Sequence, residues 1–81
     1  MTKEQIKEFK QYLADKLGLY LKDIKNKTEL AIDLGMDALD FIEIIMDCEV
    51  KFNIVIVDEE ADKCITVNDF IGMLKDCRSG K

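Results

Sequence analysis

The sequence predicts a single all-α domain, a four-helix bundle with three longer helices and one short one. Three observations predict this fold. Apolar residues recur at helical spacing in three separate segments. A residue able to cap a helix stands directly before each of these segments. The chain has 81 residues, enough for one modest hydrophobic core, so we expect one domain spanning residues 1–81.

The first helix is predicted over residues 3–17. Thr2 stands before it, and Gln5 follows three positions later, which is the spacing of a capping box. Gly18 ends it, because glycine readily adopts the left-handed conformation that closes a helix. The predicted buried face consists of Ile6, Phe9, Leu13 and Leu17.

The segment 18–37 is too long for a structureless loop in a compact domain. Its apolar residues predict a loop that packs its own side chains onto the bundle, with a short helical turn starting near Thr28 and Glu29. These apolar residues are Leu19, Leu21, Ile24, Leu30, Ile32 and Leu34.

The central helix is predicted from the cap at Asp37 to Phe52, and it is apolar on two sides. Its core face consists of Phe41, Ile44, Ile45, Cys48 and Phe52. A second stripe consists of Leu39, Ile42 and Met46, with acidic residues beside it. Such a helix either lies at the centre of a larger core or shows one side to a partner, and in a chain of this length we favour the partner.

The last third of the chain predicts two helices, at 59–64 behind Asp58 and at 67–77 behind Thr66. The β-branched run at 53–57 is interpreted as an extended loop, because an isolated strand would have no partner in a helical chain. Residues 78–81 are expected to fray. The predicted core consists of Phe9, Leu13, Ile44, Ile45, Phe52, Phe70 and Leu74.

The net charge of −5 argues against nucleic acid and anionic membrane surfaces, and for a basic partner. The acids are concentrated, because residues 28–62 carry eleven of them against Lys51 alone. No apolar run approaches the length of a membrane span, and the N-terminus lacks the apolar region of a signal peptide. We therefore expect a cytoplasmic monomer with reduced cysteines, in which Cys48 and Cys64 are buried and Cys77 is exposed.

The sequence gives little support for a catalytic site or for a specific metal site. Histidine is absent, the three cysteines lack zinc-site spacing, and no nucleophile stands beside a base. An EF-hand loop starting at Asp33 would place Ala38 at its required glycine and Ile44 at its bidentate glutamate, so that site does not form. Weak divalent binding remains open at Asp37, Asp40, Glu43 and Asp47.

Three stretches resemble the acyl carrier protein family in order and spacing: DLGMDALD at 33–40, NIVIVDEEA at 53–61 and ITVNDF at 65–70. The resemblance covers essentially the whole chain. It implies a non-enzymatic carrier of acyl intermediates in fatty acid or related lipid or polyketide synthesis. One position departs from the family's Asp-Ser-Leu motif, whose serine carries the 4′-phosphopantetheine arm, because this chain has Ala38.

A methyl group cannot attack coenzyme A, so the chain cannot be loaded as written. Either the attachment serine of a carrier has been replaced, or the protein is a natural homologue that has lost the arm. The alternative from another class is a small acidic adaptor that binds a basic partner through its central helix and carries no acyl group. The expected cofactor is 4′-phosphopantetheine only if position 38 were serine.

The resemblance also implies partners with basic surfaces, namely a phosphopantetheinyl transferase and acyl or ketoacyl synthases. The expected partner-docking residues are Asp37, Leu39, Asp40, Ile42, Glu43, Met46, Asp47 and Glu49. The expected lining of a cavity for an attached acyl chain is Leu30, Leu34 and Ile56.

Overall fold

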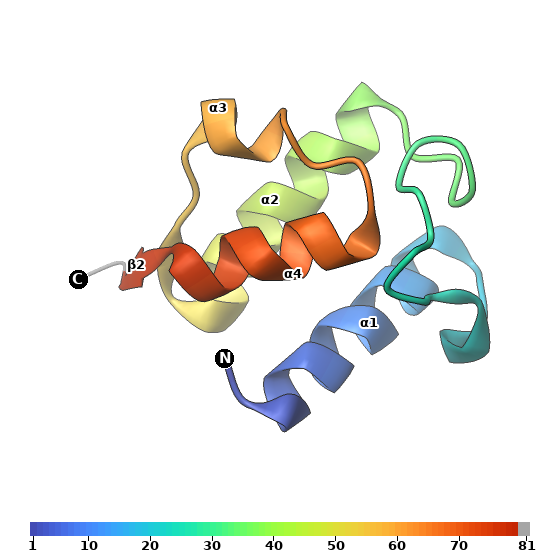
Figure 1. Ribbon diagram of the computed structural model, residues 1–81, viewed down its shortest axis with the longest axis horizontal. Coiled ribbons are helices and arrows are strands. Elements are labelled where there is room, and N and C mark those ends of the chain that lie inside the picture. The colour runs from blue at the N-terminus through green and yellow to red at the C-terminus, as the bar shows by residue number, and fades with distance from the viewer. Residues whose placement is uncertain (80–81) are drawn as a thin grey trace.

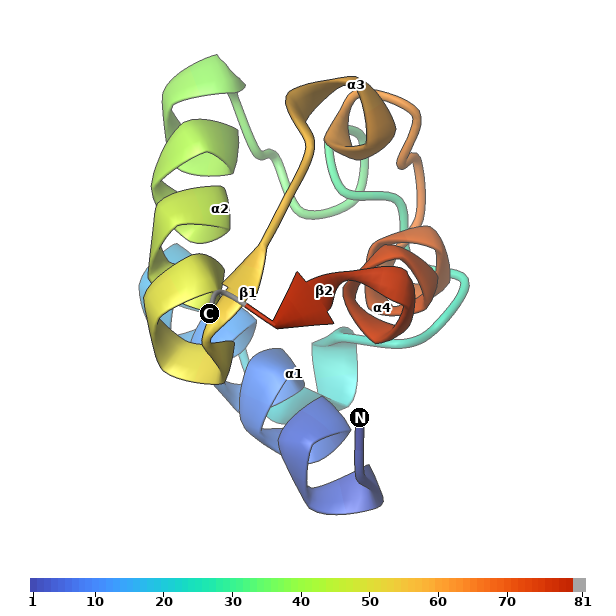
Figure 2. The ribbon, with the colours of Figure 1, turned by 90° about the vertical axis from the view of Figure 1, so that its left-hand side faces the viewer.

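The computed structural model describes residues 1–79 and confirms the all-α prediction (Figure 1). In Figure 2, α2 lies on the left, α4 on the right, α1 below and α3 above. None of the helices in the described residues is long and apolar enough to cross a membrane. The helices and strands are α1 (Lys3–Leu17), η1 (Leu21–Asp23), α2 (Ala38–Phe52), β1 (Ile54–Val55), α3 (Asp58–Ala61), α4 (Val67–Asp76) and β2 (Arg78–Ser79).

Local hydrogen bonds set the ends of α1 as the sequence predicts. The Thr2 hydroxyl accepts the Gln5 N–H at 3.1 Å, and the Gln5 side chain accepts the Thr2 N–H at 2.9 Å. Gly18 closes the helix with φ of 71° and donates its N–H to the carbonyl of Ala14. These bonds satisfy groups that a helix end would otherwise leave unpaired.

The start of α2 uses the same device with two aspartates. The Asp37 carboxylate accepts the Asp40 N–H at 2.8 Å, and the Asp40 carboxylate accepts the Asp37 N–H at 3.3 Å. The helix ends at Phe52, followed by Asn53 with φ of 52°. Asparagine is one of the few residues that tolerate this left-handed conformation.

Three helices meet at one aromatic ring. Phe70 of α4 stacks on Phe9 of α1 with 5.2 Å between ring centroids and 5° between planes. Phe41 of α2 meets Phe70 edge-on, at 5.8 Å and 85°. The predicted core residues are buried except Phe52, which packs against the core from the last turn of α2 but stays partly exposed.

The segment between α1 and α2 is fastened to the start of α4. The Leu30 N–H donates to the Ile65 carbonyl at 2.8 Å, and the Val67 N–H donates to the Thr28 carbonyl at 2.8 Å. One helical turn of bonds follows Glu29, as predicted. The short helix η1 was not predicted, and the prediction that Ile32 packs onto the bundle is wrong, because its side chain is 77% exposed.

The extended run after α2 has a strand partner, contrary to prediction. β1 pairs antiparallel with β2, with Ile54 opposite Ser79 and Val55 opposite Arg78. The chain runs on from α4 into β2, which lies beside the segment that follows α2 (Figure 2). The prediction that 78–81 frays is therefore wrong for 78–79, and residues 80–81 lie outside the described part of the chain.

The two last helices differ from prediction only at their ends. α3 spans Asp58–Ala61, so Asp58 is its first residue and not its cap, and Val57 gives no side-chain bond there. α4 spans Val67–Asp76, one residue shorter than predicted. The Thr66 hydroxyl accepts the Asp69 N–H at 3.1 Å, which confirms the predicted cap.

The glycine inside α4 offers a test of helix energetics. Gly72 has no heavy atom within 4 Å of the position a Cβ would take, apart from the helix's own backbone. Gly72→Ala should raise the free energy of unfolding by about 0.5–1 kcal/mol, because alanine loses less backbone entropy in a helix. Urea unfolding followed by circular dichroism measures the change.

Gly18→Ala is the matched control, with equally open space but a φ of +71°. The same substitution there should destabilise the protein, since alanine is strained in the left-handed region. A Gly72→Ala variant less stable than the wild type would contradict the prediction.

Asp69 makes the capping of α4 depend on pH. Its carboxylate accepts the N–H groups of Thr66 at 3.0 Å and Ile65 at 3.1 Å, and these bonds hold its pKa below the ordinary value. A depressed folded-state pKa contributes stability above the unfolded pKa of about 3.9, and this stability is lost as pH falls through the folded value.

Asp69→Asn should therefore lower the Tm at pH 7, and the difference from the wild type should be smaller at about pH 2, because falling pH progressively protonates the carboxylate. Differential scanning calorimetry at the two pH values measures it, with the exposed Asp62→Asn as control. A deficit of equal size at both pH values would mean that the charge of Asp69 has no part in the cap.

Candidate functional site

Position 38 lies at the open start of α2. Ala38 is exposed as the first residue of the helix, directly after the cap at Asp37. It borders a hollow of about 390 Å³ between the start of α2 and the end of α3. The hollow is lined by Met36, Asp37, Ala38, Phe41, Ile42, Asp62 and Cys64.

The chemistry available at this position is set by one atom. The N-terminus of a helix carries partial positive charge and unpaired N–H groups, which favour a phosphate. A serine here would present its hydroxyl at such an end, beside an apolar hollow. Ala38 presents a methyl group instead, so the position offers the setting of a phosphodiester without the atom that would bond to it.

The second apolar stripe of α2 is exposed, as predicted. Leu39 is 64% exposed, Ile42 55% and Met46 59%. Val50, one turn further along, is 85% exposed and extends the stripe. We call these four residues the apolar strip; their role in docking stays a prediction.

The acids beside the apolar strip have partners within the chain. Glu43 forms an ion pair with Lys16 of α1 at 3.0 Å. Asp47 accepts a hydrogen bond from the hydroxyl of Tyr12, also in α1. These two carboxylates therefore lie on the side of α2 that faces α1, next to the strip.

Glu49 lies on the other side of α2. Its carboxylate is partly buried and accepts the Ile56 N–H at 3.0 Å, which holds the segment after β1 against the helix. Sequence reasoning grouped Glu49 with the docking acids, but the structure gives it a bond to the backbone, which periodicity could not reveal.

The contacts between α1 and α2 shift the pKa values of their donors. Burial raises the pKa of Tyr12, and the hydrogen bond to Asp47 raises it further. The hydrogen bond to Glu43 raises the pKa of Lys16. Tyr12 therefore keeps its proton and Lys16 its charge throughout the physiological range. Nearby, Lys51 pairs with Glu8 at 3.2 Å and lies 5.9 Å from the centre of the Tyr12 ring.

The structure does not gather the acids that sequence reasoning left open for divalent binding. Asp37 and Asp40 cap each other's N–H groups, and Glu43 and Asp47 bind Lys16 and Tyr12. Within residues 1–79, no group of three or more His, Cys, Asp or Glu side chains could hold a metal ion.

The residues expected to line an acyl cavity are all in the core. Leu30, Leu34 and Ile56 are buried and belong to the same cluster as the stacked phenylalanines. That they hold an acyl chain stays a prediction.

The cysteines have protonated thiols. Cys48 is buried as predicted, and burial raises the pKa of its thiol to about 12. Cys64 is only partly buried, contrary to prediction, with a pKa raised to about 11, chiefly by burial. Cys77 is also partly buried where exposure was expected. Since the thiolate is the reactive form, none of the three is set up as a nucleophile.

Known proteins share this sequence pattern. The family described as "Phosphopantetheine attachment site" matches residues 7–74. The acyl carrier protein of Exiguobacterium sp. is 41% identical over 93% of this chain and 96% of its own. The acyl carrier protein of Clostridium acetobutylicum is 39% identical over 93% of this chain and 94% of its own length. The acyl carrier protein of Wolinella succinogenes is 39% identical over 79% of this chain and 84% of its own length.

The exposure of the apolar strip predicts which substitutions in α2 the fold tolerates. Met46→Gln should change the free energy of unfolding by less than about 0.5 kcal/mol, because folding buries little of the Met46 side chain. Ile45→Ala, at the neighbouring buried position, should cost about 2–5 kcal/mol. Chemical denaturation of both variants tests this; a similar loss for the two would mean that Met46 belongs to the core.

Proposed function

The chain belongs to the acyl carrier protein family, and we propose that it is a carrier domain of acyl-chain synthesis whose attachment position is blocked by Ala38. Members of this family are carriers and not enzymes. The carrier role would be to hold acyl intermediates on a 4′-phosphopantetheine arm in fatty acid or related lipid or polyketide synthesis. With alanine at position 38, the domain docks but is not loaded.

The observation that carries the proposal is the geometry around position 38. Ala38 is exposed at the first turn of a capped helix, where a phosphodiester is favoured. The residues that line the hollow beside it include the apolar Met36 and Phe41 and the acidic Asp37 and Asp62. The exposed first turn and the hollow beside it support attachment to a serine at this position.

The proposed docking surface is the apolar strip together with its acids. An exposed stripe on a helix of so small a domain calls for a partner. The acidic block of residues 28–62 favours a partner with a positively charged surface, such as a phosphopantetheinyl transferase or a ketoacyl synthase would present. The helix supplies apolar contact area, and the acids supply attraction and orientation.

A second candidate function follows from the missing hydroxyl itself. A homologue that has lost the arm and keeps the apolar strip would be an adaptor, binding a basic partner through α2 without an acyl group. Both candidates use the same surface of α2. They differ in whether the surroundings of position 38 still support attachment, so the substitution that restores serine separates them.

Ala38→Ser, incubated with coenzyme A and a phosphopantetheinyl transferase of broad specificity, should gain one phosphopantetheine. Its hydroxyl would give its proton to a base of the transferase and attack the phosphorus of the coenzyme A pyrophosphate that bears the pantetheine. The P–O bond of the pyrophosphate would break, adenosine 3′,5′-bisphosphate would leave, and the new phosphodiester would lie at the start of α2. Mass spectrometry of the intact protein measures the gain. Folding should be unaffected, because serine and alanine differ by a few tenths of a kcal/mol, about 0.5 at most, at an exposed helical position.

The wild-type chain, treated in the same way, is the matched control and should gain nothing. An Ala38→Ser protein that is folded by circular dichroism yet stays unmodified would overturn the blocked-carrier proposal and favour the adaptor.

A further inference from the structure

We propose that, of the two carboxylates between the apolar strip and α1, Asp47 and not Glu43 attracts a basic partner to α2. The inference rests on the proposed docking function and names the residue that governs it. Asp47 and Glu43 are one helical turn apart on the same side of the apolar strip, and they carry the same charge. What separates them is the group that each one meets on α1.

Glu43 is neutralised within the chain. Its Oε1 lies 3.0 Å from the ammonium of Lys16, and only 24% of the Lys16 side chain is exposed. An opposite charge at this distance cancels most of the field that a carboxylate projects into solvent. A cation of the partner would have to displace Lys16 before it could gain the full attraction of Glu43.

Asp47 is held by a donor that brings no charge. The Tyr12 hydroxyl donates to Oδ2, and Tyr12 keeps its proton because its pKa is raised by burial and by this bond. The neutral hydroxyl does not cancel the charge of the Asp47 carboxylate as an ammonium would. Among residues 1–79, no group donates a hydrogen bond to the other carboxylate oxygen, Oδ1, so Oδ1 is available to an incoming donor. The bond to Tyr12 also orients the carboxylate in advance, which lowers the entropy cost of docking.

The other nearby cation is engaged elsewhere. Lys51 lies one turn beyond Asp47, but its ammonium is 3.2 Å from the carboxylate of Glu8. Lys16 also feels the charge of Asp47, though its hydrogen bond is to Glu43. A partner cation at Asp47 thus adds an ion pair without breaking one.

The test compares two substitutions that remove the same charge. Asp47→Asn should slow association with a phosphopantetheinyl transferase about fivefold at low ionic strength, whereas Glu43→Gln should slow it less than about twofold. Both rates are measured by stopped-flow fluorescence and again at high salt, where the difference should shrink. Equal effects, or a larger effect of Glu43→Gln, would overturn the proposal.

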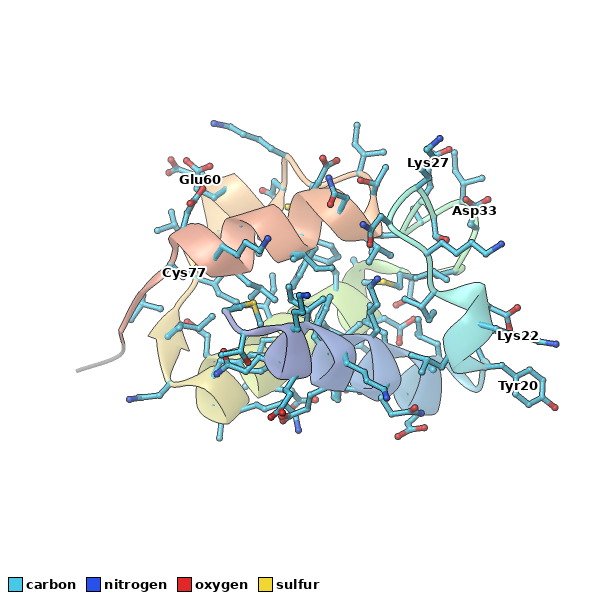
Figure 3. The ribbon with its side chains drawn as sticks, turned by 60° about the horizontal axis from the view of Figure 1, so that its bottom comes forward. Tyr20, Lys22, Lys27, Asp33, Glu60 and Cys77 are labelled. Carbon is cyan, nitrogen blue, oxygen red and sulfur yellow. The ribbon has the colours of Figure 1, made fainter. Side chains whose placement is uncertain are left out.

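Removing the masking group supplies the second arm. In the background of Lys16→Met, Glu43→Gln should slow association about fivefold, because Glu43 is then uncovered. Lys22→Met is the control for the loss of one positive charge; Lys22 extends from η1 at one end of the molecule (Figure 3), beside the ring of Tyr20. If Glu43→Gln still changes the association rate by less than about twofold in the Lys16→Met background, Lys16 does not mask the charge of Glu43 and the proposal fails.

A second probe separates this inference from the proposed function. A synthetic amphipathic peptide with arginines beside leucines needs no carrier activity in order to bind the apolar strip. If the transferase does not bind but the peptide distinguishes Asp47→Asn from Glu43→Gln, the blocked-carrier function falls and the role of Asp47 stands. If the transferase binds but neither probe distinguishes the variants, the role of Asp47 falls alone. If neither probe binds the wild type, α2 attracts no basic partner and both fall.

Discussion

The packing of Phe70 against Phe9 and Phe41 is the interaction on which the rest of the structure depends. Phe9 and Phe70 are almost completely buried, and the three rings come from α1, α4 and α2. A chain of 81 residues has room for one core only. Since all three longer helices contribute a ring to that core, each helix has one face committed to it. The apolar strip of α2 is what remains outside.

The segment before α2 connects position 38 to this core through buried residues and backbone hydrogen bonds. Met36 is buried two residues before Ala38, and its N–H donates to the Leu30 carbonyl at 3.2 Å. Leu30 is itself buried and bonded to Ile65, just before α4. The exposed start of α2 is thus supported by buried residues directly behind it.

Charge is used for two purposes in this protein. Part of it joins α1 to α2, through the pairs that Lys16 and Lys51 form with Glu43 and Glu8. The rest leaves the α2 side of the molecule negative toward solvent. A carboxylate contributes to long-range attraction only when its own chain does not cancel it. The count of acids in α2 therefore overstates the charge that a partner meets, and the neighbours of each acid decide the difference.

The sequence by itself determined the features that depend on contacts three or four residues apart. The caps at Thr2, Asp37 and Thr66 and the stop at Gly18 follow from local bonds, and the structure confirms them. Helical periodicity places the right sides of the helices toward the core, although four of the predicted residues are only partly buried: Ile6, Leu17, Phe41 and Phe52. That residue 38 is alanine can be read directly from the sequence. The α1 range of 3–17 agrees residue for residue, because both of its ends are set by side chains or glycine conformations that are visible in the sequence.

Only the tertiary structure decided which distant groups meet. The pairing of β1 with β2, the different partners of Glu43 and Asp47, and the bond from Ile56 to Glu49 join residues whose spacing carries no periodic signal. Exposure at Ile32 and partial exposure at Phe52 likewise depend on where neighbouring elements end. A helical pattern states which residues share a face, but the residue opposite that face is set by how the elements pack.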